Sequence, residues 1–343
     1  MMRPKLFAYD LAGRSIAMAD GPDLLIHDGQ DESPRWRKTG EAAWTVVGLG
    51  VGQVIAADAE GRLLRYDEQT GAELQRIELG LPIGTGTTSE DGVAWLLAAD
   101  QLIALHPDGR KDSTPVTSPT AIAVAPSGSR AVAEAGGRLL IFDGEAQKTL
   151  ELGGAVEALA WHPRGFWLAA VQDKLLRIDG TSHLVESYTR AGGSTITAVA
   201  CNPDTVALVL DEKTAVALSH PSKDTRGNAS YFDRKITGVA LGPAPWLGVG
   251  LDLGDGNKID LATGAVCRTD THPGRDHHRW ALQVAVGEPP REETRRGPLP
   301  TAPAGAGAGA GAALRTRKNN SLMLPLVLTA FLIALWILRM LAR

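Results

Sequence analysis

One short phrase recurs along the sequence, and its spacing limits the possible folds more than any other feature. Each copy is a run rich in apolar residues that ends in aspartate, as in GRLLRYD, GRLLIFD and DKLLRID, and two weaker copies, DQLIALH and KTAVALS, fill the gaps. The copies end at Asp28, Asp67, His106, Asp143, Asp179, Ser219 and Asp260. The steps between these ends are 39, 39, 37, 36, 40 and 41 residues, so the chain contains seven similar units.

A second marker runs in phase with the first. Proline precedes the phrase end by 16 or 17 residues in four units, at Pro126, Pro163, Pro203 and Pro243. Between the markers lie strand-like runs such as AIAVAP, ITAVACNP and VALVLD, each bounded by turn residues. A unit of about 40 residues with about four short strands has the length of one propeller blade.

The sequence therefore predicts an all-β fold, a seven-bladed β-propeller over residues 1–287. A further strand-like run, RWALQVAV at 279–286, has too little space for an eighth blade, and we expect it to pair with blade one near KLFAYD and close the ring. An open β-solenoid is the alternative fold, although its coils are usually shorter than these units.

The repeats resemble two known families. The endings LIHD, LRYD, LIFD and LRID are similar to the terminal dipeptide of WD repeats with the tryptophan replaced, and Trp161-His162-Pro163 resembles that family's inner-turn phrase. The run 55–80 is similar to a pyrroloquinoline-quinone-type repeat, whose Asp67-x-x-Thr70-Gly71 returns as Asp260-x-x-Thr263-Gly264.

Both resemblances imply a propeller and neither implies a cofactor. Repeats of the quinone class end this phrase with a docking tryptophan four residues after the glycine, where this chain has Gln75 and Arg268. The Gly-His signature of WD repeats is also missing. We therefore expect no bound cofactor.

The C-terminal segment predicts a membrane anchor. Residues 322–338, LMLPLVLTAFLIALWIL, are 17 consecutive uncharged and mostly apolar residues. This run is at the short end of what a helix needs to cross the hydrocarbon core, and the following Arg339 can snorkel to the headgroups. A helix buried in a protein core is the alternative. The residues expected to span the membrane include Leu322, Pro325, Phe331, Trp336 and Leu338.

A linker separates this segment from the repeats. Residues 288–320 are rich in Pro, Gly and Ala and poor in bulky apolar residues, which predicts disorder, so the expected domains are the propeller (1–287), the linker (288–320) and the anchor (321–343). From residue 288 onward the chain has 8 Lys and Arg against 3 Asp and Glu, which leaves 27 against 36 in residues 1–287. An acidic body disfavours nucleic acid as a partner.

The N-terminal residues predict the topology. MMRPKLFAYD contains no apolar core long enough for a signal peptide, so we expect the propeller to stay in the cytoplasm on a single-pass anchor. Only Cys201 and Cys267 are present, which agrees with a reducing compartment. Arginine outnumbers lysine 25 to 10, which indicates a GC-rich bacterial source. The expected location is therefore a bacterial inner membrane.

Three groups of residues resemble chemical sites, and each has a simpler interpretation. His272, Asp276, His277 and His278 are interpreted as a solvated loop, because neighbouring histidines of an extended chain point apart. DLGDGNKID (252–260) is interpreted as a hairpin because of its Asp-Gly pair, and Gly48, Gly50 and Gly52 as a turn at the inner strand of a blade. We predict no catalytic, cofactor or metal site.

One basic and aromatic run stands out in the acidic body. Arg35, Trp36, Arg37 and Lys38 fall on the last strand of blade one and are the candidate contacts for an acidic partner. A solvated outer strand is the alternative. We expect a tail-anchored interaction platform that recruits proteins or peptides. An enzyme or small-ligand binder using the central channel and a structural subunit of a membrane complex are the alternatives.

Overall fold

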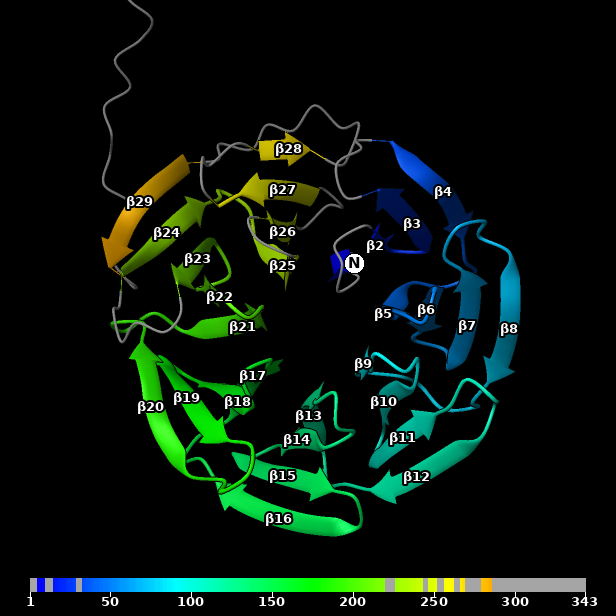
Figure 1. Cartoon of the computed structure of the whole chain (residues 1–343), viewed down its shortest axis with the longest axis horizontal. Helices are drawn as coiled ribbons and strands as arrows, with labels where there is room; N and C mark the ends of the chain where they lie inside the picture. Colours follow the sequence, from blue (N-terminus) through cyan, green and yellow to red (C-terminus); the bar gives the residue numbers. More distant parts are fainter. Residues whose placement is uncertain are drawn as a thin grey trace, which may run out of the picture. The chain divides into compact units, whose positions relative to one another are not determined.

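The protein folds as a ring of seven antiparallel sheets, six with four strands and one with five, as the computed structural model shows (Figure 1). The structure describes residues 5–9, 15–28, 33–219, 226–242, 246–251, 256–261, 266–268 and 279–285. The prediction of an all-β seven-bladed propeller is confirmed for this part of the chain, and the solenoid alternative is wrong. Within each blade the strands follow one another in sequence order from the axis to the circumference.

The strands of blades one to four are β1 (Lys5–Tyr9), β2 (Ser15–Asp20), β3 (Asp23–Asp28), β4 (Pro34–Thr39), β5 (Trp44–Gly50), β6 (Gln53–Asp58), β7 (Arg62–Asp67), β8 (Glu73–Glu78), β9 (Thr85–Thr88), β10 (Ala94–Ala98), β11 (Gln101–Leu105), β12 (Lys111–Pro115), β13 (Pro119–Val124), β14 (Arg130–Glu134), β15 (Arg138–Asp143) and β16 (Ala146–Glu151). Those of blades five to seven are β17 (Val156–His162), β18 (Phe166–Val171), β19 (Lys174–Asp179), β20 (Val185–Arg190), β21 (Ile196–Cys201), β22 (Thr205–Leu210), β23 (Thr214–Ser219), β24 (Arg226–Tyr231), β25 (Ile236–Leu241), β26 (Trp246–Leu251), β27 (Gly256–Asp260) and β28 (Val266–Arg268).

The recurring phrase of the sequence is the third strand of each blade. Every marker ends that strand, except His106, which follows β11 by one residue. The seven markers therefore lie on one rim of the ring, which we call the marker rim; it also carries the turns between first and second strands. The opposite rim carries the turns between second and third strands and the links from blade to blade.

Burial explains why the second and third strands are so apolar. Each blade packs both faces against neighbours, so β18 is buried along its whole length, whereas the outer strand β16 is almost entirely exposed. Six apolar clusters fill the junctions from blades one and two to blades six and seven. The blades are thus stable only as a closed stack.

The expected ring-closing strand lies elsewhere. A strand over Arg279–Ala285, β29, pairs antiparallel with β24 as a fifth, outermost strand of blade six (Figure 1). The prediction that this run pairs with blade one near KLFAYD is wrong. Blade one has four strands of its own, and its β1 packs against β25 and β5 around the axis, which leaves no room for a fifth strand there. The run instead extends the outer edge of blade six.

Several predicted features lie outside the described residues. They are the linker 288–320, the membrane segment 322–338 and the histidine-rich loop 272–278. Within the described ranges, no helix has the length and hydropathy needed to cross a membrane. The glycines at 48, 50 and 52 lie in β5 and its turn, as predicted, and β26 and β27 form the predicted hairpin, with Gly256 in the strand rather than the turn.

Candidate functional site

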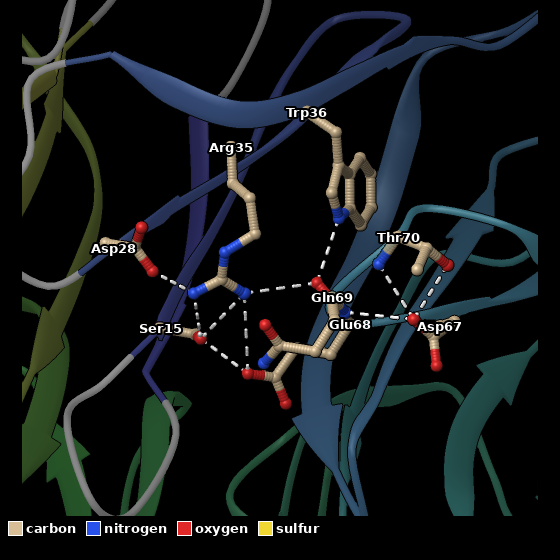
Figure 2. Close-up of polar contacts among 8 residues, drawn as sticks. All are labelled: Ser15, Asp28, Arg35, Trp36, Asp67, Glu68, Gln69 and Thr70. Carbon is tan, nitrogen blue, oxygen red and sulfur yellow. Dashed lines mark hydrogen bonds and ion pairs between the residues drawn. The ribbon is translucent and has the colours of Figure 1, made fainter.

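The predicted basic and aromatic run occupies β4, the outer strand of blade one. Trp36 pairs with Ile26 of β3 and Pro34 pairs with His27, so Arg35 is an extra residue in a β-bulge. A bulge breaks the strict alternation of side chains along a strand. Arg35 and Trp36 therefore both turn toward blade two, as Figure 2 shows, whereas Arg37 and Lys38 are exposed.

Arg35 and Trp36 both contact Glu68, which lies in the loop after β7. Its main-chain oxygen accepts hydrogen bonds from Trp36 Nε1 at 2.9 Å and from an Arg35 guanidinium nitrogen at 3.2 Å (Figure 2). Its carboxylate accepts the hydroxyl proton of buried Ser15, and Arg35 also pairs with Asp28. These contacts join three strands of blade one to blade two and form a clasp on the marker rim.

The loop that carries Glu68 is formed by Asp67-x-x-Thr70-Gly71, the run that resembles a quinone-type repeat. Asp67 Oδ1 accepts hydrogen bonds from the Gln69 amide at 3.1 Å and from the Thr70 amide and hydroxyl, both at 2.8 Å. These donors lower the pKa of Asp67, the Thr70 amide first. Gly71 follows with φ of 69°, in the left-handed region. The phrase therefore builds a tight, rigid loop.

Trp36 docks on this loop. A Cβ atom added to Gly71 would lie 2.9 Å from Trp36 Cδ2, so the indole packs directly on the glycine. Its ring centroid lies 5.9 Å from that of Tyr66. Trp36 follows Asp28 by eight residues, the same offset that separates Gln75 from Asp67. The docking tryptophan missing from blade two is thus present in blade one, a signal that the sequence analysis missed.

Arginines hold two further junctions. Arg65 on β7 is 1% exposed and donates hydrogen bonds to the main-chain oxygens of Gly92 at 2.7 Å and Leu105 at 2.9 Å in blade three. Arg130 on β14 lies 4.8 Å from the Trp95 ring of blade three. Burial lowers the pKa of both guanidinium groups. These arginine side chains of the marker rim are therefore engaged in contacts between blades.

The opposite rim contains a pocket. A cavity of about 540 Å³ opens among blades two, three and four, within the size range of ligand pockets. Its walls are mainly apolar, and the side chains of Thr85 and Thr120 supply hydroxyl groups. The lining residues are Ala59, Pro82, Ile83, Gly84, Thr85, Leu97, Ala99, Pro119 and Thr120.

Beside this pocket, the inner strands share a repeated irregularity. Five of them have a β-bulge close to their first residue, on the opposite rim. The extra residues are Thr45, Thr120, Glu157, Thr197 and Thr237. Since the inner strands surround the axis (Figure 1), these residues encircle the axial opening of the opposite rim. The sequence analysis did not identify them.

A metal cluster is absent from the described ranges, and Cys201 is not a reactive thiol. They contain no group of three or more His, Cys, Asp or Glu side chains arranged to hold a metal. Cys201 Sγ donates to the main-chain oxygen of Trp161 at 3.0 Å, and burial raises the pKa of the thiol to about 12. This cysteine is therefore a protonated packing residue.

Comparisons with known proteins identify the fold alone. The chain is similar to the solved β-propeller domain of Cps50 (Swd1) from Myceliophthora thermophila, with a TM-score of 0.59 and 13% identity over 73% of this chain and 93% of that one. No family model matches the chain, and no curated protein matches it. The resemblance to WD-type propellers is thus structural.

Proposed function

We propose that this propeller is a non-enzymatic interaction platform that binds proteins or peptides through its opposite rim. The pocket of about 540 Å³ among blades two, three and four carries this proposal. Propeller folds commonly bind proteins, and a concave, mainly apolar surface with a few hydroxyl groups suits an extended peptide segment. The marker rim, in contrast, commits Arg35, Trp36, Arg65 and Arg130 to contacts between blades.

The basic strand β4 offers fewer free side chains for partner binding than its sequence implied. Arg35 and Trp36 are bound within the clasp, and Arg37 pairs with Asp23 while keeping 59% of its side chain exposed. Arg37 and Lys38 therefore remain candidates for an auxiliary acidic contact on the circumference of blade one. The pocket is the main candidate, because it buries ligand surface that an exposed strand cannot.

The second part of the proposal is location. The apolar segment 322–338 supports a single-pass anchor, and the disorder-prone linker 288–320 would let the propeller search for partners near the bilayer. The proposed location is the cytoplasmic face of a membrane, the inner membrane in a bacterium. A chain ending at residue 320 should leave the membrane fraction, whereas full-length protein found in the soluble fraction without detergent would contradict the anchor.

Capture of partners from detergent extracts tests the platform itself. Ala59→Trp places a large side chain at the pocket, and Ser127→Trp makes a matched change at an exposed position of the marker rim. A partner retained by the wild type and by Ser127→Trp but lost with Ala59→Trp supports the proposal. Identical capture by all three proteins would place binding elsewhere, and the absence of any stoichiometric partner would contradict the platform.

A further inference from the structure

The fifth strand of blade six, β29, has a free edge on the circumference of the ring. The sheet of this blade runs in the order β21-β22-β23-β24-β29, so β29 is its last strand (Figure 1). Within the described part of the chain, no strand pairs with its far edge. A free edge presents main-chain N–H and C=O groups, and another strand can pair with them.

The free edges of the other blades are protected against such pairing. The outer strands of blades one to five, β4, β8, β12, β16 and β20, each contain at least two charged residues. Charged side chains on an edge strand prevent it from pairing with a further strand. The outer strand of blade seven, β28, has only three residues, and so short an edge offers little to pair with.

The β29 edge has neither protection. Its seven residues contain one charge, on Arg279 at the first position, and the run from Trp280 to Ala285 is uncharged. The strand also contains no proline and no glycine, which is the composition of a segment that pairs readily with other strands. The contrast with five charged edges on the same ring indicates that the β29 edge has a specific occupant.

The sequence of β29 fits a second copy of itself. Two copies related by a two-fold axis through this edge pair antiparallel, so each residue meets one from the other end of the strand. For an axis anywhere between Ala281 and Gln283, Arg279 of one copy lies opposite an uncharged residue of the other, in the run from Gln283 to Gly287. Parallel pairing in register would instead place Arg279 against Arg279, which is unfavourable.

We propose that two copies of this chain associate through their β29 edges and join their blade-six sheets into one continuous antiparallel sheet. The centre of this contact is at Leu282 and Gln283. These two residues form a bulge in which neither has a partner residue on β24. A substitution at Gln283 therefore acts on the contact between copies and spares the paired residues of β24. This surface is separate from the pocket and adds self-association to the platform function.

Light scattering after size-exclusion chromatography tests the proposal on the full-length protein in non-ionic detergent. At micromolar concentration the wild type should have twice the mass of the chain. Gln283→Lys and Gln283→Glu should each be monomeric, because two like charges then lie close to the two-fold axis. An equimolar mixture of the two variants should regain the dimer, because the lysine of one copy then lies near the glutamate of the other.

Thr149→Lys is the matched control, because Thr149 is an exposed residue in the middle of the outer strand β16. It should remain dimeric, and circular dichroism confirms that each variant is folded. A monomeric wild type, a dimer that persists in both charged variants, or a mixture that stays monomeric would overturn the proposal. A dimer that is also lost with Thr149→Lys would place the contact elsewhere and overturn it as well.

Discussion

Trp36 of blade one packs on Gly71 of blade two, so closely that a single Cβ atom on the glycine would lie 2.9 Å from the indole. The loop that presents Gly71 also presents the Glu68 oxygen that accepts the indole N–H. Two residues 35 positions apart in sequence are thereby matched in shape and in hydrogen bonding. The clasp shows how a phrase that resembles a quinone-type repeat acts here as a structural joint.

Gly71→Ala should destabilise the propeller by roughly 1–3 kcal/mol, because the new methyl group both strains a left-handed residue and displaces Trp36. Urea unfolding measures the loss. Gly128→Ala is the control: its φ is 85°, and a Cβ there meets nothing within 4 Å. If the two variants lose the same stability, the packing against Trp36 contributes nothing.

Arg65→Met should cost about 1–3 kcal/mol, because it leaves the buried main-chain oxygens of Gly92 and Leu105 without donors. The comparison is Lys111→Met on the exposed outer strand β12, which should change the unfolding midpoint little. An Arg65→Met protein as stable as the wild type would contradict the role assigned to this arginine.

The contribution of Asp67 should depend on pH. Its pKa is lower in the folded protein than in the unfolded chain, so its charged form stabilises the fold above the unfolded pKa of about 3.9. This stabilisation is lost as the pH falls through the folded pKa. Asp67→Ala should therefore be less stable than the wild type at pH 7, and the difference should shrink below about pH 4.

Asp143 ends the third strand of blade four without such a loop. Its carboxylate accepts the Ser129 hydroxyl, and β16 begins only three residues later, so the turn has no room for the loop that surrounds Asp67. Unfolding curves of Asp67→Ala and of the wild type at pH 7 and pH 3 measure the pH dependence of the Asp67 contribution. A difference between Asp67→Ala and the wild type that stays constant with pH would show that the carboxylate charge is irrelevant.

A chain ending at residue 278 should keep a closed seven-bladed ring but lose some stability and self-associate, because removing β29 exposes the edge of β24. Circular dichroism and light scattering measure the two effects. Global unfolding of this shortened chain would mean that β29 is needed to hold the ring together.

The spacing of the markers was enough to predict the blades, because each unit must place its third strand at the same depth in the ring. The side-chain arrangement was less predictable. Asp67 and Asp179 accept amide and hydroxyl hydrogen bonds from the loops that follow them, whereas Asp28 pairs with Arg35. The bulge at Arg35 depends on blade two, which local sequence does not reveal.

The position of β29 and the candidate site escaped sequence reasoning for related reasons. The outer strand of every blade offers a free edge, and the local sequence does not reveal which of these edges the final strand joins. The pocket joins residues from three blades, from Ala59 to Thr120, and none forms a motif with its neighbours in sequence. The bulged threonines have no signature beyond an ordinary strand residue.

The most direct test of the central claim is photo-crosslinking from the two rims in intact cells. p-Benzoylphenylalanine replaces Ala59 at the pocket in one full-length protein and Ser127 on the marker rim in the other, both exposed positions. The platform account predicts a discrete crosslinked partner from position 59 and none from position 127. A partner crosslinked from position 127 alone, or equally from both positions, would contradict the claim that the opposite rim is the binding face.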